Sequence, residues 1–300
     1  MNSQFSIYNE LTMNTKEILL KAQKEGYAIG AFNAANIETL KAITLAAKKL
    51  NSPIIIEASK GEVDYIGKTQ LVDLIKDYRN ELNIPIILNL DHSESFEECE
   101  EAVNAGFDYI HFDGSKLPYD ENLKIAKEIV KMCHAKGIIV EGEMDHIQGS
   151  SADHTKEKPD EVLDKTLYTD PKKAKIFVDE TGIDTFAAFF GNLHGLYSTE
   201  KRLKLDVLEE IRNLLPNTFL SLHGGSGIDN KDIMTAIKIG KIVKININSE
   251  MRVAFKNALK RSLNETSEVA IYKITPGAIE EVQKIVEGKI KLFGSENRAS

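Results

Sequence analysis

Cysteine is scarce in this chain of 300 residues, which has only Cys99 and Cys133 and no CxxC motif. Their number and spacing exclude a disulfide framework and a cysteine-ligated metal site, and two free thiols fit a reducing cytosol. No apolar run approaches the roughly 20 residues that span a bilayer. The first residues, MNSQFSIYNELTM, lack a basic stretch followed by an apolar core. We therefore expect a cytoplasmic protein with no membrane partner.

Clustered positive charge is also missing. The 38 Lys and Arg residues are outnumbered by 46 Asp and Glu, the formal net charge is -8, and the lysines are scattered. This distribution excludes the basic face of a nucleic-acid-binding protein. An anionic small substrate would need local positive charge from a metal or from helix N-termini. No Pro/Ser-rich linker or shift in composition divides the chain, so we expect residues 1–300 to form one domain.

The chain does contain a regular alternation of short β-branched runs and longer segments of helical period. The expected strands are 27–33, 53–58, 85–90, 108–113, 137–143, 184–190, 217–222 and 241–247. Between them, apolar residues recur at three- and four-residue steps, as in NIETLKAITLAAKKL (36–50). Strands that alternate with helices pair in parallel. Eight such units in this length favour a closed (β/α)8 TIM barrel, an α/β fold, over an open doubly wound sheet.

Three segments lie outside the eight units. Residues 15–25 are expected to form an extra N-terminal helix, and residues 276–293 a helical extension after the last unit. The connection from Met144 to Thr169 follows the fifth strand and is long and polar. Loops of this length are usually functional lids or partly disordered, so this one is a candidate lid.

Polar residues stand at the expected C-terminal ends of several strands, where barrels of this kind place their active sites. His92, His194 and His223 end apolar runs in the third, sixth and seventh units, and Asp91 precedes His92. A single histidine at a strand end is more often a hydrogen-bonded core residue than a ligand. Three histidines on converging strands can hold zinc with one position left open for substrate, although imidazole also suits cobalt, iron and nickel.

Glycine and small polar residues follow the seventh and eighth strands. GGSG (224–227) opens one helix, and NINSE (246–250) begins another. Backbone amides in such a loop approach an anion closely, and a helix N-terminus favours negative charge, so we expect a phosphorylated substrate here. A metal beside a phosphate and a carboxylate suits proton abstraction next to a carbonyl. It also suits hydrolysis of a phosphate ester, so both reactions remain open at this point.

Seven motifs extend this pattern along the chain. They are NLDHS (89–93), AGFDYIHFDGSKLP (105–118), VEGE (140–143), YTDP (168–171), GNLHGLY (191–197), LHGGSGI (222–228) and KININSE (244–250). As an ordered set they resemble the class II, metal-dependent ketose-bisphosphate aldolases, which include fructose- and tagatose-bisphosphate aldolases. The resemblance runs from residue 14 to residue 258 and returns in KIKLFGS (289–295). It implies a zinc-dependent lyase that cleaves a ketose 1,6-bisphosphate to dihydroxyacetone phosphate and an aldehyde such as glyceraldehyde 3-phosphate.

The resemblance also implies roles for individual residues. It assigns metal binding to His92, His194 and His223 and proton transfer to Asp91. Asp113 and Glu143 would match an alternate metal site of some members, or would orient the histidines without touching metal. The phosphate of the dihydroxyacetone phosphate half would be held by Gly195, Gly224, Gly225, Ser226, Asn246, Asn248 and Ser249. A homodimer or homotetramer is implied as well.

Two segments depart from the family pattern. Many members carry, in an acidic loop after the fifth strand, the acid that protonates the enediolate. Here that segment reads EMDHIQGSSADHTKE (143–157), where Asp153 or Glu157 is the nearest carboxylate. Many members also carry an Asp-Pro-Arg segment whose arginine reaches the distal phosphate across a subunit interface. Here NETSEVAIYKITPG (264–277) replaces it, so the distal end of the substrate is less well defined.

Fructose 1,6-bisphosphate is the expected substrate, because Asn248 is polar where tagatose-type members often carry a small apolar residue. Tagatose 1,6-bisphosphate, or another phosphorylated ketose or keto-sugar acid, is the alternative within the class. Outside the class stand a metal-dependent phosphohydrolase on the same barrel and a non-catalytic aldolase-like subunit. The complete set of Asp91 and three histidines argues against the non-catalytic subunit.

Overall fold

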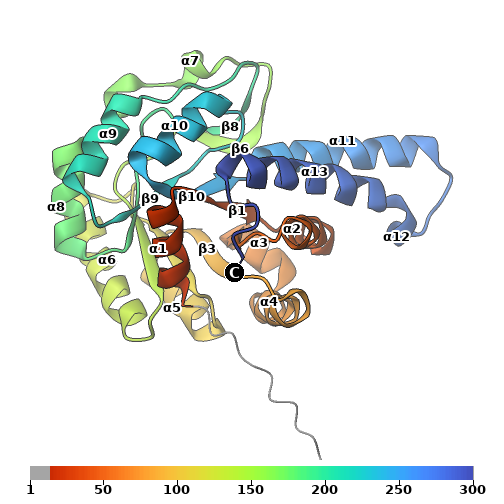
Figure 1. Ribbon diagram of the computed structural model, residues 1–300, viewed down its shortest axis with the longest axis horizontal. Coiled ribbons are helices and arrows are strands. Elements are labelled where there is room, and N and C mark those ends of the chain that lie inside the picture. The colour runs from red at the N-terminus through yellow and green to blue at the C-terminus, as the bar shows by residue number, and fades with distance from the viewer. Residues whose placement is uncertain (1–13, 300) are drawn as a thin grey trace, which may run out of the picture.

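A closed barrel of parallel strands forms the centre of the computed structural model, which describes residues 14–299 (Figure 1). The barrel strands are β1 (Ile29–Asn33), β2 (Ile54–Ser59), β3 (Ile86–Ser93), β4 (Tyr109–Asp113), β5 (Ile139–Glu143), β7 (Thr185–Ala187), β9 (Phe219–Leu222) and β10 (Ile242–Ile247). Their order around the barrel is β1-β10-β9-β7-β5-β4-β3-β2. Each expected strand is present, which confirms the predicted (β/α)8 barrel. Residues 1–13, which contain the segment analysed for a signal peptide, lie outside the described residues.

Helices cover the outside of the barrel. They are α2 (Ile37–Lys49), α3 (Lys60–Ile66), α4 (Lys68–Leu82), α5 (Phe96–Ala105), α6 (Tyr119–His134), α8 (Pro171–Thr181), α9 (Leu205–Leu214) and α10 (Asn230–Gly240). The YTDP motif begins α8: Asp170 Oδ1 accepts the Lys172 N–H at 2.8 Å, and Pro171 takes the first helical position, where no N–H is needed.

The helical extension at the C-terminus has three parts. α11 (Ser249–Glu265) runs away from the barrel, α12 (Ile271–Ile274) forms the tip, and α13 (Pro276–Phe293) returns (Figure 1). α13 packs against α2 and β1 and so takes the place of the eighth outer helix. Its bounds equal the predicted range. The tip carries the exposed apolar side chains Leu263, Val269, Ile271 and Tyr272.

The predicted N-terminal helix, α1 (Thr15–Glu25), closes one end of the barrel. The Asn14 side chain accepts the Lys16 N–H at 3.0 Å, and Gly26, in the left-handed conformation with φ 74°, ends the helix. Its buried face packs on the first residues of the strands. Because this end is filled by apolar side chains, polar chemistry is confined to the opposite end.

Alternate residues of the strands face the barrel interior and form layers, except in β10, which shifts register between Ile242 and Lys244. The layer next to α1 is apolar and consists of Ile29, Ile55, Ile87, Tyr109, Ile139, Phe219 and Val243. The next layer is polar and buried: Glu57, Asn89, His111, Glu141, Ser221 and Lys244. The third layer, at the C-terminal strand ends, contains Asn33, Asp91, Asp113, Glu143, His223 and Asn246. The polar layer therefore lies directly beneath the candidate site.

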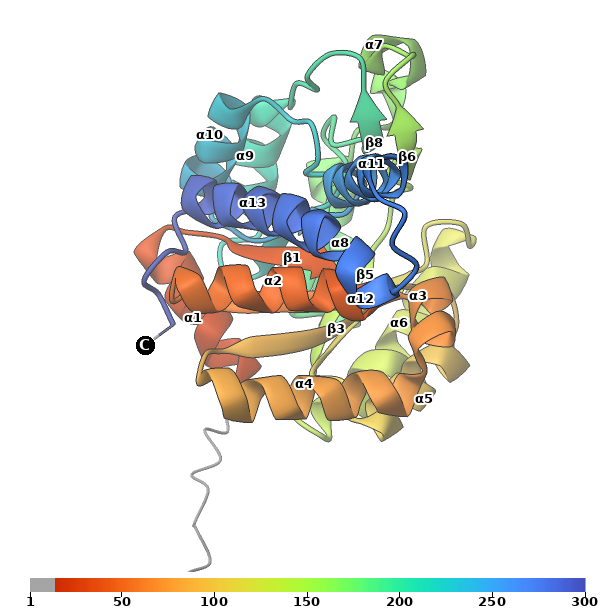
Figure 2. The ribbon, with the colours of Figure 1, turned by 90° about the vertical axis from the view of Figure 1, so that its right-hand side faces the viewer.

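A small second sheet stands above the C-terminal ends of the barrel strands. β6 (Gly149–His154) lies in the 144–169 loop and pairs in parallel with β8 (His194–Tyr197), next to α11 (Figure 2). The same loop contains α7 (Pro159–Val162) and a 3-10 turn at Lys165–Leu167. The loop is thus largely structured. The sequence did not predict β6, because GSSADH has no apolar alternation and its paired residues on β8 lie 43 to 45 positions later in the chain.

One strand prediction is corrected. β7 ends at Ala187 rather than at residue 190, so His194 does not end a barrel strand and is instead the first residue of β8. The chain turns between them because Asn192 accepts the Phe190 N–H at 2.8 Å and donates to the Ala188 carbonyl at 3.1 Å. Gly191, at φ 102°, completes the turn.

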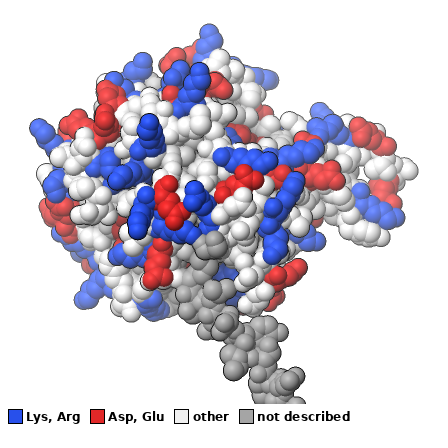
Figure 3. All heavy atoms as spheres, in the orientation of Figure 1, with Lys and Arg blue, Asp and Glu red and all other residues white. Residues whose placement is uncertain are grey.

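The outer surface has no single sign of charge on the face shown in Figure 3, where Lys and Arg are interspersed with Asp and Glu. Within residues 14–299, no helix is long and apolar enough to cross a membrane.

Candidate active site

An irregularity in β3 brings two neighbouring residues into the same site. The pairing of β3 with β4 shifts register between Leu90 and Ser93, and His92 adopts a left-handed conformation with φ 49°. In a regular strand, neighbouring side chains point to opposite faces. Here both Asp91 and His92 line one pocket. A positive φ at a residue other than glycine is often stored strain at a functional site.

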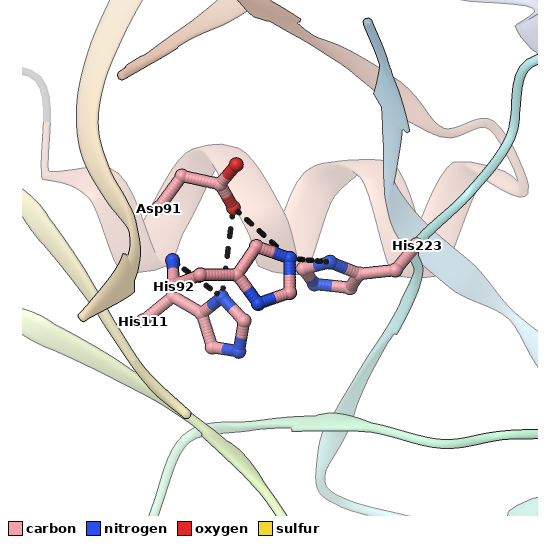
Figure 4. A group of neighbouring side chains, drawn as sticks. All are labelled: Asp91, His92, His111 and His223. Carbon is pink, nitrogen blue, oxygen red and sulfur yellow. Dashed lines mark hydrogen bonds and ion pairs between the residues drawn. The ribbon is translucent and has the colours of Figure 1, made fainter. Parts of the chain in front are cut away.

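His92 and His223 face each other across the barrel mouth (Figure 4). His92 Nδ1 lies 2.9 Å from Asp113 Oδ2, and His223 Nε2 lies 2.8 Å from Glu141 Oε1. Each carboxylate takes a ring N–H, which leaves His92 Nε2 and His223 Nδ1 as lone pairs only 3.2 Å apart. Two facing lone pairs repel each other, and a proton or a cation between them relieves the repulsion. The Asn246 amide nitrogen also lies 3.3 Å from His223 Nδ1 and can donate to it. A carboxylate behind an imidazole is also the usual support of a metal-ligating histidine.

Three carboxylates surround His92. Its ring lies close to the carboxylates of Asp91, Asp113 and Glu143. Burial opposes protonation, yet the charge of Asp91 raises the pKa of His92. Burial and the charge of Asp113 raise the pKa of Glu143, whose buried Oε2 lies 3.3 Å from His111 Nε2. These carboxylates would attract a divalent cation bound beside His92.

Two groups of side chains are close enough together to hold an ion. Asp91, His92, His111 and His223 form one, and His92, Asp113 and Glu143 form the other, with ligand atoms in each within 4.8 Å of one another. His194 belongs to neither group. Its ring centroid lies 5.2 Å from that of His92 and 6.1 Å from that of His223. Burial lowers the pKa of His223 to about 3 and that of His194 well below its ordinary value, so both imidazoles are neutral and able to ligate.

The Asp91 carboxylate is ionised and fixed in place by two amides. Burial opposes ionisation, but His92 and His111 lower the pKa of Asp91 well below its ordinary value. Asn33 Nδ2 donates to Oδ2 at 3.2 Å, and Asn246 Nδ2 donates to Oδ1 at 3.3 Å. A fixed carboxylate in the pocket wall can accept a proton from a bound substrate.

Four functional candidates in the polar layer were not identified from the sequence. They are Glu57, His111, Glu141 and Lys244. His111 Nδ1 accepts the His92 N–H at 3.2 Å, so the ring supports the irregular β3 backbone. Lys244 Nζ donates to Glu141 Oε2 at 2.6 Å. Strand alternation could have found His111, because it lies two residues before Asp113, which the sequence did single out.

The glycine-rich loops meet at the mouth of the same pocket. This pocket is lined by Asp91, His92 and His194 and by six of the seven residues that are expected to bind the phosphate. The six are Gly195, Gly224, Ser226, Asn246, Asn248 and Ser249. Gly225 does not line the pocket, because its N–H donates to the Asn246 carbonyl at 3.0 Å. A Cβ on Gly224 would lie 2.3 Å from the Leu193 carbonyl oxygen, and φ there is 61°. Only glycine fits this close approach of two loops.

Lys201, also not predicted, joins these loops. Its buried Nζ donates to the carbonyls of Leu193 (2.6 Å), Gly195 (3.1 Å) and Gly224 (2.6 Å). Burial lowers the pKa of Lys201 to about 7. Three acceptors match the three N–H groups of an ammonium, whereas a neutral amine would leave one carbonyl facing a lone pair. We therefore take Lys201 as charged at neutral pH.

The two candidate acids of the 144–169 loop lie outside the pocket. Asp153 is exposed, and its Oδ1 accepts from Thr155 N at 3.1 Å and Thr155 Oγ1 at 2.7 Å. The Glu157 side chain is 53% exposed and lies 3.4 Å from His154 Nδ1. Ser151 is the residue of this loop that lines the pocket. Asp153 follows it by two positions on β6, whose pairing with β8 shifts register between Gly149 and Asp153.

Comparison with known proteins agrees with this barrel and its site. Residues 13–298 match the family model for class II fructose-bisphosphate aldolase. The chain belongs to this family, whose members are metal-dependent lyases.

Individual relatives cover nearly the whole chain. A fructose-bisphosphate aldolase of Staphylococcus aureus (strain Mu50) is 38% identical over 291 residues, which are 96% of this chain and 99% of that protein. One of Geobacillus stearothermophilus is 36% identical over 296 residues, with the same coverage. Among solved structures, the YdjI aldolase from Escherichia coli K12 is 30% identical with a TM-score of 0.80, and the match covers 95% of this chain and 98% of that one.

Proposed function

We propose that this protein cleaves fructose 1,6-bisphosphate reversibly to dihydroxyacetone phosphate and glyceraldehyde 3-phosphate. The observation that carries the proposal is the pair of facing lone pairs on His92 and His223, placed beside the Asp91 carboxylate and a glycine-lined pocket. The fructose-bisphosphate aldolases among its relatives support this substrate. Tagatose 1,6-bisphosphate, or another phosphorylated ketose, is the alternative.

His92, His194 and His223 would hold the metal. Neutral imidazoles suit zinc, and cobalt fits the same donors. When bound, the ion would polarise the ketose carbonyl and stabilise negative charge beside it. Asp113 and Glu141 would orient His92 and His223, because each accepts the outward N–H of its ring. Asp113 and Glu143 also remain candidates for an alternate ion position around His92.

Asp91 would remove the proton of the C4 hydroxyl. The C3–C4 bond then breaks, the aldehyde forms at C4, and the electron pair stays with the dihydroxyacetone phosphate half. A second acid must protonate that half. We retain Asp153 and Glu157 as candidates and favour Asp153, because it directly follows the small-residue run 149–152, which contains the pocket-lining Ser151 and could act as a hinge. A shift of β6 along β8 would bring Asp153 toward the pocket.

The glycine-lined end of the pocket would hold the phosphate of the dihydroxyacetone phosphate half. Gly195, Gly224 and Ser226 approach from one side, and Asn248 and Ser249 at the start of α11 approach from the other. A helix N-terminus attracts an anion through its free N–H groups and its dipole. Asn246 would act mainly by orienting Asp91 and Glu57.

We further propose a cytoplasmic homodimer or homotetramer. The exposed apolar side chains at the tip around α12 support an interface between copies, because a patch of this kind often marks a contact surface. Analytical ultracentrifugation tests the oligomer, and a monomer at micromolar concentration would contradict it.

The cleavage proposal is tested with a panel of phosphorylated ketoses. Purified protein with zinc should release triose phosphate from fructose 1,6-bisphosphate faster than from tagatose 1,6-bisphosphate. Inorganic phosphate without triose phosphate would instead identify a phosphohydrolase. The absence of any product from every ketose phosphate would identify a non-catalytic protein.

A further inference from the structure

Arg252 joins two segments that lie far apart in the sequence, β6 and α3. It lies in the first turn of α11, and its Nη1 donates to the Ser151 carbonyl on β6 at 2.9 Å. Its Nη2 donates to Glu62 Oε1 on α3 at 2.7 Å. Ser151 lines the pocket. The Arg252 side chain thus ties the 144–169 loop to α3.

Glu62 carries this contact inward to Asp91. Its side chain is only 7% exposed, and its Oε2 accepts the Asn33 amide at 3.0 Å. The same Asn33 nitrogen donates to Asp91 Oδ2 at 3.2 Å. An amide nitrogen has two hydrogens, so both are used. Ser59 N and Oγ also donate to Glu62 Oε2, at 2.9 and 3.0 Å, which prevents the carboxylate from turning.

We propose that Arg252 is a positioning residue that couples the place of β6 to the orientation of the Asp91 carboxylate, through Glu62 and Asn33. The inference rests on the proposed role of Asp91 as the base. Without the guanidinium, Glu62 would be a buried carboxylate with no cation beside it, and such a group changes protonation or moves. The Asn33 amide would then lose its hydrogen bond to Glu62, and the Asp91 carboxylate would no longer be held in one orientation.

A direct role in binding the distal phosphate is the competing explanation for an arginine at this place. The contacts favour positioning. Both terminal nitrogens of Arg252 already donate to protein oxygens, and the charge is neutralised by Glu62. The test therefore uses two substrates with the same dihydroxyacetone phosphate half: fructose 1,6-bisphosphate and fructose 1-phosphate, which lacks the distal phosphate.

The first measurement is steady-state kinetics of Arg252→Gln, with Arg261→Gln as the matched control. Arg261 lies on the same helix and is exposed far from the pocket. Misplacement of a reacting group by about 1 Å lowers rates up to roughly 100-fold. We expect Arg252→Gln to lower kcat about 10- to 100-fold on both substrates by the same factor, with KM little changed. Arg252→Lys, which keeps a donor for Glu62, should restore part of kcat, and Arg261→Gln should match the wild type.

A double-variant cycle tests the route through Glu62. If Arg252 acts through Glu62, the Arg252→Gln/Glu62→Gln protein should be as active as the less active of the two single variants. The reason is that the effects of substitutions within one contact network do not add. Fully additive losses would overturn the route. A rise in KM confined to fructose 1,6-bisphosphate would overturn positioning and make Arg252 a receptor for the distal phosphate.

The last measurement needs no catalysis. Amide hydrogen exchange of residues 149–154 should quicken in Arg252→Gln and stay unchanged in Arg261→Gln, because β6 loses its tie to α11. Unchanged exchange at residues 149–154 of Arg252→Gln would overturn the proposal. A lower melting temperature of this variant together with wild-type kcat would also overturn it. If the wild type cleaves neither substrate, the proposed function fails, and exchange still decides whether Arg252 holds β6.

Discussion

Glu141 offers the sharpest test of how the buried polar layer supports the site. Its carboxylate is fully buried and accepts from His223 Nε2 at 2.8 Å, from Lys244 Nζ at 2.6 Å and from Ser221 Oγ. Replacing it with glutamine keeps the shape and removes the charge. Lys244 would then be a buried cation whose remaining carboxylate partner, Glu57, lies 3.6 Å away.

The expected loss of stability is large. Removing one partner of a buried ion pair typically costs about 3–5 kcal/mol, because the other charge stays buried and uncompensated. The glutamine side chain also carries an NH2 group. This group would face one of the three donors that the wild-type carboxylate accepts from, so one hydrogen bond would be lost. We therefore expect Glu141→Gln to lower the free energy of unfolding of the metal-free protein by about 3–5 kcal/mol, measured by urea denaturation. The metal affinity should fall about 10- to 100-fold, because His223 loses the carboxylate that orients it.

Two further variants separate these effects. Glu141→Gln/Lys244→Met removes both charges and should regain much of the stability, since an apolar replacement of a buried pair is often neutral. Its metal affinity should stay low. Glu143→Gln is the matched control: it lies two residues along the same strand, and within residues 14–299 its ion-pair partners are His92 and His111 rather than a lysine. It should cost the metal-free protein much less, because burial and Asp113 already disfavour its charge.

The acid dependence follows from the same contacts. Burial opposes ionisation of Glu141, but Lys244 and His111 hold its pKa well below the ordinary value. Its contribution to stability is therefore complete above the ordinary glutamate pKa and is lost as pH falls through the lowered pKa. Glu141→Gln should lack this part of the acid transition. A stability within about 1 kcal/mol of wild type, or a double variant less stable than Glu141→Gln, would refute the reasoning.

Four further predictions concern the site itself. A chelator should abolish cleavage and zinc or cobalt should restore it, whereas borohydride trapping of a lysine–substrate adduct would contradict a metal mechanism. Asp91→Asn should lower kcat roughly 10²–10⁴-fold with metal content near that of wild type, and metal loss on analysis would make Asp91 structural. Asp153→Ala or Glu157→Ala should spare carbon–carbon cleavage but let hexacyanoferrate intercept the enediolate; wild-type turnover of the double variant would place the acid elsewhere. Lys201→Met should lower the free energy of unfolding in urea by about 3 kcal/mol or more, because three carbonyls lose a charged donor, and an unchanged midpoint would exclude this role.

Local patterns in the sequence determined the barrel and much of the site. Apolar runs of period two and helices of period 3.6 depend on neighbouring residues alone, so each barrel strand was predicted within a few residues. Asp91, His92 and His223 stand at strand ends, and parallel strands bring those ends together. The structure brings the ligand atoms of these three residues within 4.8 Å of one another, while their roles stay predictions.

Contacts between distant parts of the chain were decided by the tertiary structure. Lys244 meets Glu141 across 103 residues, and Arg252 meets Glu62 across 190. No local pattern encodes such pairs, because each depends on the order and register of strands around the closed barrel. The left-handed backbone at His92 belongs here too, since it arises where β3 and β4 lose register. Sequence periodicity fixes which face a side chain takes, whereas closure of the barrel decides which partner it finds there.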